Sequence, residues 1–155
     1  MSTTVQGPIK PEYAPLFAPG FHDVEEGKLD ELFIDPFPDP SVRKDLVENF
    51  RSLLNVIRGI GVSAEVWLDG SFATRKPDPV DIDIVIYFDP VELQALDLQH
   101  QKTLDELADN NKSRMKYKCD LYFALNNRPE LRSYWRGWFS FTRTEEPKGI
   151  ARIFI

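Results

Sequence analysis

The segment VDIDIVIYF at residues 80–88 constrains the fold more than any other part of the sequence. Successive side chains of a strand point to opposite faces, so the three isoleucines share one face while Asp81 and Asp83 share the other. An isoleucine face belongs in a packed core. The segment therefore predicts a strand whose second face carries two carboxylates, with Cα atoms about 6–7 Å apart.

The elements around this strand predict a small mixed sheet flanked by helices. The clearest helix spans 41–58, because its apolar residues recur every three or four positions, at Val42, Leu46, Phe50, Leu53 and Ile57. Helices and strands are interleaved without an internal repeat, which indicates an α/β or α+β class. Further helices are expected at 25–33, 91–108 and 128–139, and further strands at 64–69, 116–125 and 149–155.

The chain of 155 residues has the length of one domain, preceded by a proline-rich segment. Seven of the 12 prolines lie in the first 40 residues, where each fixes φ and removes a backbone donor. We therefore expect residues 1–40 to form an N-terminal arm with one short helix, and residues 41–155 to form the main domain. The arm is a candidate surface for a protein partner or for a second copy of the chain.

Composition excludes several classes of protein. The formal net charge is −6, which argues against coating nucleic acid through bulk positive charge. Cys119 is the single cysteine, so an internal disulfide and a cysteine-rich zinc site are excluded. The sequence has no apolar signal region and no stretch near the roughly 20 apolar residues of a membrane span. A cytoplasmic protein that does not bind membranes is expected.

The charge is unevenly distributed. Residues 112–155 hold 10 Lys and Arg against 4 Asp and Glu, a balance of +6, and residues 1–111 hold 9 against 21, a balance of −12. Two interpretations stay open: an ordinary uneven surface, or a basic last third that binds a polyanion locally.

The paired carboxylates indicate a metal site. Asp81 and Asp83 on one strand face repel each other unless a cation lies between them. Mg²⁺ takes such oxygen ligands, commonly one or two carboxylates together with substrate phosphates. In the strand predicted at 116–125, Asp120 lies on the face opposite Cys119. If that strand pairs beside 80–88, Asp120 completes a triad of candidate catalytic and metal-binding residues for Mg²⁺ or Mn²⁺.

A candidate phosphate-binding turn precedes these carboxylates. Gly70 permits close approach of a phosphate to the backbone, and Ser71 can cap the turn that follows. Arg75 and Lys76 come just beyond it and are either phosphate contacts or a solvated loop. Lys148 is a further candidate for contact with a triphosphate.

Gly-Ser at the end of a strand, nine intervening residues, Asp-Ile-Asp-Ile, and a lone Asp in a later strand together resemble the DNA polymerase beta-like nucleotidyltransferase superfamily. The likeness is strongest to its minimal single-domain members. Segments 19–33 and 138–153 are similar to a group of small nucleotidyltransferase-like bacterial proteins. Pro77 and Pro79 depart from the superfamily pattern, because they restrict the helix after Gly-Ser to about one turn.

The resemblance implies a nucleotidyltransferase-like domain over 41–155 that transfers a nucleotidyl group from an NTP to a hydroxyl with two metal ions. Gly70 and Ser71 would hold the triphosphate, Asp81 and Asp83 would bind metal, and Asp120 would help to activate the acceptor hydroxyl. The acceptor is expected on a protein, an RNA or a nucleotide.

Two alternative functions remain open. The chain is either a non-catalytic module that acts through a partner, as an antitoxin or regulatory subunit, or a metal-dependent phosphohydrolase or nuclease that uses the same carboxylates.

Overall fold

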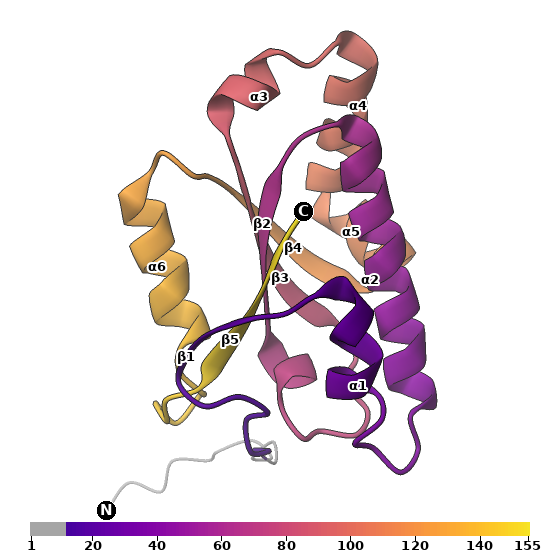
Figure 1. Ribbon diagram of the computed structural model, residues 1–155, viewed down its shortest axis with the longest axis vertical. Coiled ribbons are helices and arrows are strands. Elements are labelled where there is room, and N and C mark those ends of the chain that lie inside the picture. The colour runs from indigo at the N-terminus through magenta and orange to yellow at the C-terminus, as the bar shows by residue number, and fades with distance from the viewer. Residues whose placement is uncertain (1–11) are drawn as a thin grey trace, which may run out of the picture.

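The computed structural model describes residues 12–155, and within them one mixed β-sheet carries helices on both faces (Figure 1). Across the sheet the strand order is β1-β5-β2-β3-β4. The pairs β1–β5 and β3–β4 are parallel, whereas β5–β2 and β2–β3 are antiparallel. The expected α+β class with a mixed sheet is confirmed. The strands are β1 (Gly20–Asp23), β2 (Ala64–Asp69), β3 (Ile82–Phe88), β4 (Cys119–Leu125) and β5 (Gly149–Phe154).

The helices form two unequal layers. The long helix α2 lies with α4 and α5 on one side of the sheet, and α6 lies alone on the other side (Figure 1). No helix within residues 12–155 combines the length and apolar character needed to cross a membrane. The α-helices are α1 (Leu29–Phe33), α2 (Ser41–Ile60), α3 (Pro90–Gln94), α4 (Leu98–Ala108), α5 (Asn110–Tyr117) and α6 (Pro129–Phe139), and the 3₁₀ turns are η1 (Glu26–Lys28) and η2 (Gly70–Ala73).

Each face of the sheet packs its own apolar cluster. The isoleucines of β3 belong to the larger cluster with α2, as their alternation predicts. Trp67, Val85 and Tyr87 point to the other face and form a smaller cluster with Phe139 of α6. The sheet is therefore covered on both sides along most of its length, and polar side chains gather at one end.

The buried stripe of α2 differs from expectation at one position. Val42 is 41% exposed, and its neighbour Arg43 is fully buried instead. The remaining predicted positions are buried, and Gly61 ends the helix in the left-handed region at φ +86°. The cause is hydrogen bonding, because the Arg43 guanidinium donates to backbone carbonyls that the apolar pattern does not reveal.

Several boundaries differ from the expected ones. The helix expected at 91–108 is two helices, because the Asp97 side chain accepts from His100 N at 2.8 Å and starts α4 afresh. The strand expected from 116 begins at Cys119, since α5 continues to Tyr117. The strand expected from 80 begins at Ile82, so Asp81 precedes it.

The N-terminal segment adds a strand that the sequence pattern did not predict. Within the described part of this segment, β1 pairs with β5, and α1 packs on α2 (Figure 1). Residues 14–16 run beside the loop after β2, with Leu16 N donating to Ala73 O at 3.0 Å and Arg75 N donating to Ala14 O at 2.8 Å. The first part of the expected arm, residues 1–11, lies outside the described residues.

Candidate functional site

A row of three carboxylates crosses three neighbouring strands at one end of the sheet. Asp69 ends β2 and is the ladder partner of Asp83 on β3, which in turn is the partner of Asp120 on β4. Directly paired residues project to the same face, so all three carboxylates lie on the face that α6 covers further along the strands. We call Asp69, Asp83 and Asp120 the carboxylate row. The predicted proximity of Asp83 and Asp120 is confirmed.

Asp81 lies beside the row without being part of the sheet. It precedes β3, is half-buried, and lines a surface groove of about 420 Å³ together with Arg114 and Lys118. Burial and the negative charge of Asp120 raise the pKa of Asp81. The sequence predicted that Asp81 and Asp83 lie on one face of one strand. The charge of Asp81 does act on Asp83, but Asp81 is the last residue before β3 and not part of the strand.

Burial and neighbouring negative charges raise the pKa values of two carboxylates of the row. Burial first, and then the charges of Asp81 and Asp120, raise the pKa of Asp83 to about 6. Burial raises the pKa of Asp69 to about 7 despite the opposing charge of Lys148. The positive charge near these two carboxylates is too small to offset burial and negative neighbours, so their pKa values are raised. A divalent cation would supply that charge.

In this structure, glycine is needed at position 70 because of the backbone conformation and close packing there, and not because of contact with a phosphate. Its φ is +77°, and a Cβ built on it would lie 2.9 Å from Asp83 Cγ. The turn of η2 that follows is a single 3₁₀ turn, as Pro77 and Pro79 led us to expect. Asp69 occupies the N-cap position of this turn with no side-chain cap, so the expected capping by Ser71 is wrong. Ser71 is half-buried, and its carbonyl accepts from Thr74.

Asp120 is held by residues that the sequence analysis did not select. Asn110 Nδ2 donates to Oδ1 at 3.0 Å, Tyr122 Oη donates to Oδ2 at 3.1 Å, and Arg114 forms an ion pair with Oδ1 at 3.0 Å. Both oxygens are thereby oriented. Tyr122 is two residues from Asp120 on the same strand face, which was a readable signal. Asn110 and Arg114 come from α5, which was itself not predicted.

Asp69 is a further residue that the sequence analysis missed, and its partner is Lys148, which was expected to contact a phosphate. Lys148 Nζ lies 2.8 Å from Asp69 Oδ1, and both side chains are largely buried. Lys148, expected as a phosphate contact, therefore pairs within the protein. Alternation in β2 places Asp69 on the same face of the strand as the buried Trp67, so the strand pattern could have predicted that Asp69 is buried.

The loop after the Gly-Ser turn is fixed from below by Arg43. Its guanidinium donates to Phe72 O at 2.9 Å, Thr74 O at 2.7 Å and Lys76 O at 2.6 Å. The same guanidinium lies 3.7 Å from the ring centroid of Phe37. Burial lowers the pKa of Arg43 to about 10, so the group is still charged at neutral pH. Arg43 is a structural clamp on residues 72–76.

The other two expected phosphate contacts lie on this clamped loop. Arg75 is exposed, and its backbone N–H is used by Ala14. Lys76 is half-buried, and its charge acts on Asp81. Lys76 is thus near the acidic end of the sheet, whereas nothing in the contacts of Arg75 directs its side chain there.

The carboxylates have the right chemistry for a hard cation but are not converged into a finished cage. Within residues 12–155, no three His, Cys, Asp or Glu side chains meet in the geometry of a metal centre. Arg114 and Lys148 contact the two outer carboxylates of the row. Asp69 is buried, with Lys148 on Oδ1 and no hydrogen bond to Oδ2. All-oxygen donors, raised pKa values and an unsatisfied carboxylate fit Mg²⁺ or Mn²⁺.

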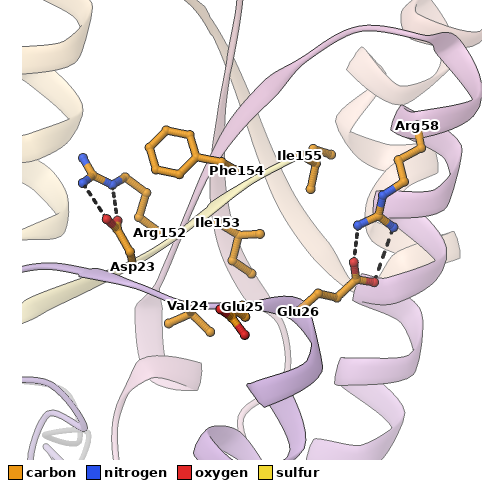
Figure 2. A pocket seen from close by; sticks show the side chains of 9 residues that line it. All are labelled: Asp23, Val24, Glu25, Glu26, Arg58, Arg152, Ile153, Phe154 and Ile155. Atoms are coloured by element: carbon orange, nitrogen blue, oxygen red, sulfur yellow. Dashed lines mark hydrogen bonds and ion pairs between the residues drawn. The ribbon is translucent and has the colours of Figure 1, made fainter.

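A second cavity, of about 310 Å³, lies at the opposite end of β5 (Figure 2). Figure 2 shows its two arginines turned toward acidic partners: Arg152 binds Asp23, with Nε to Oδ1 at 2.6 Å, and Arg58 pairs with Glu26. Both guanidinium groups are already neutralised. The carboxylate end of the sheet is therefore the stronger candidate site.

Comparison with known proteins identifies a family. No curated protein and no solved structure matches this chain. A family model described as a family of unknown function, DUF6932, matches residues 11–154 and so includes the whole sheet and every candidate site residue. The chain therefore belongs to the DUF6932 family.

Proposed function

We propose that this chain is a metal-dependent nucleotidyltransferase that moves an NMP from an NTP to a hydroxyl on a protein, an RNA or a nucleotide. The observation that supports it is the carboxylate row, with Asp81 beside it and the Gly70–Ser71 turn against Asp83. Four carboxylates beside a tight glycine turn are costly in a fold that has no use for a cation.

In this proposal Asp81 and Asp83 hold Mg²⁺ or Mn²⁺. When bound, the ion neutralises charge that develops on the transferred phosphate and aligns the reacting oxygens. The acceptor hydroxyl oxygen forms a bond to the α-phosphorus, and the bond from that phosphorus to the β-bridging oxygen breaks and releases pyrophosphate. Asp120 accepts the hydroxyl proton, while Asn110 and Tyr122 keep its carboxylate oriented. Lys76 and the Gly70–Ser71 turn contact the phosphates.

The test is transfer of label from α-labelled NTPs, with Mg²⁺ or Mn²⁺, to components of a cell lysate or to total RNA. Wild type is compared with Asp81→Asn, Asp83→Asn and the control Asp105→Asn, an exposed carboxylate on α4. We expect a discrete labelled band with wild type and the control, and none with the two site variants. Labelling by Asp81→Asn and Asp83→Asn that equals labelling by wild type refutes the mechanism. Release of free nucleotide with no labelled acceptor indicates a phosphohydrolase instead.

A non-catalytic binding module is the second candidate. The observation in its favour is that Lys148 and Arg114 neutralise the two outer carboxylates from within the chain. Calorimetry with Mg²⁺ and ATP, together with gel filtration of co-purified complexes, separates the two. Absence of metal-dependent nucleotide binding, with a stable protein complex, favours the binding module.

A further inference from the structure

We infer that Asp69 is a ligand of a divalent cation shared with Asp83, and that Lys148 is the counter-ion it exchanges for that cation. This inference rests on the proposed metal-dependent function and adds to it a fourth carboxylate, from β2. The expectation from sequence placed the ligands at Asp81, Asp83 and Asp120 alone.

The burial of Asp69 carries the first step. Its side chain is 1% exposed, Lys148 Nζ lies 2.8 Å from Oδ1, and Oδ2 has no ion pair and no hydrogen bond. A buried polar group without hydrogen bonds costs free energy, and a buried charge costs more unless it is paired. Lys148 contacts only Oδ1. Among the described residues no group therefore occupies Oδ2, which leaves this oxygen able to bind a cation.

The geometry of the ladder carries the second step. Asp69 and Asp83 are direct partners on neighbouring strands and project to the same face. Strands lie about 4.8 Å apart, and Mg²⁺ binds oxygen at about 2.1 Å, so two carboxylates on directly paired positions are close enough for one ion to bind both. Gly70 lets the Asp83 carboxylate lie over the backbone directly after Asp69, where a Cβ would displace it. The close approach is therefore a feature of the turn itself.

The charge balance carries the third step. When all four are ionised, Asp69, Asp81, Asp83 and Asp120 bring four negative charges to this end of the sheet. Among the described residues, Lys148 and Arg114 are the two cations in ion-pair contact with them, on Asp69 and Asp120 respectively. Two negative charges remain, which one divalent cation balances. The more distant Lys76 reduces the potential without contacting a carboxylate of the row.

The competing explanation is an ion pair that only ties β5 to β2. In that case Asp69 acts through Lys148, and removing Lys148 should leave Asp69 with no influence on cation binding. If Asp69 is a ligand, its removal weakens binding whether or not Lys148 is present. The two explanations therefore differ in a double-mutant cycle.

The experiment measures binding of Mn²⁺ alone to the full chain, by electron paramagnetic resonance of free Mn²⁺. We expect Asp69→Asn to weaken binding about tenfold or more, both in the wild-type chain and in the Lys148→Met background. Asp23→Asn, which removes a carboxylate paired with Arg152, is the control and should bind as wild type does. Equal binding by Lys148→Met and by the Asp69→Asn/Lys148→Met double variant overturns the inference.

Crystals of the wild-type chain grown with Mn²⁺ give a readout that does not depend on variant folding. We expect anomalous density within about 2 Å of an Asp69 oxygen, with Lys148 Nζ moved away. Density at Asp81 and Asp83 alone, with Asp69 still on Lys148, overturns the inference but leaves the proposed function standing. Mn²⁺ bound to Asp69 in a protein that transfers no label supports the inference and contradicts the proposed function.

Discussion

Asp83 packs directly over Gly70, so closely that a Cβ at residue 70 would lie 2.9 Å from Asp83 Cγ. The contact joins the two parts of the candidate site, the turn after β2 and the carboxylates of β3. It also explains why glycine is needed there twice over, since φ is +77° and the space above the backbone is taken.

Replacing Gly70 should therefore be harmful where replacing a second glycine is not. We expect Gly70→Ala to lower the free energy of unfolding by about 1–3 kcal/mol, because it strains φ and displaces Asp83. Gly59→Ala within α2 is the matched control, since a Cβ there meets nothing within 4 Å. It should raise stability by up to about 1 kcal/mol. Urea unfolding measures both, and a neutral Gly70→Ala contradicts the packing described.

Stability of the chain in EDTA should fall as pH rises between about 5 and 8. The pKa values of Asp69 and Asp83 are about 7 and about 6, above the 3.8 expected when unfolded. In this window the folded protein holds protons that the unfolded chain has released, so raising the pH favours unfolding. The melting temperature should drop by about 3 °C or more between pH 5.5 and pH 8. Asp69→Asn should flatten the dependence, and a melting temperature that rises with pH is incompatible with this account.

Removing one carboxylate of the row should stabilise the chain at pH 8 and remove its response to metal. We expect Asp83→Asn in EDTA to be more stable than wild type by about 1 kcal/mol or more, because the cost of burying the charge and the repulsion from Asp81 and Asp120 are both relieved. Mg²⁺ should raise the melting temperature of wild type and not that of the variant. Asp105→Asn serves as control and should behave as wild type in both tests. Equal stabilisation of wild type and Asp83→Asn by Mg²⁺ argues against Asp83 as a ligand.

Arg43 should matter for stability far more than an arginine on the outer side of the same helix. Arg43→Met leaves the carbonyls of Phe72, Thr74 and Lys76 without their donor and should cost about 3 kcal/mol or more. Arg51→Met, which breaks an exposed ion pair with Asp30, should cost at most about 1 kcal/mol. Hydrogen exchange should accelerate across residues 72–76 only in the Arg43 variant. Unchanged exchange there disproves the clamp.

Local patterns accounted for much of the fold. The alternation at 80–88 and the apolar stripe of α2 predicted the central strand and the long helix, because burial of one face imposes its period on the sequence. The same patterns failed at β1, whose four residues are too short to show a period. They also failed between residues 91 and 118, where the capping aspartates Asp97 and Asp109 start new helices.

The candidate site divides in the same way. By itself the sequence determined that Asp81 and Asp83 lie at the start of a buried strand, shortly after a glycine turn. Only the tertiary structure decided that Asp120 and Asp69 flank Asp83 on the same face, that Lys148 pairs with Asp69, and that Arg43 clamps the loop. The physical reason is register. Alternation within a strand sets which face a side chain takes, but which residues become neighbours across strands is settled by pairing between segments far apart in the chain.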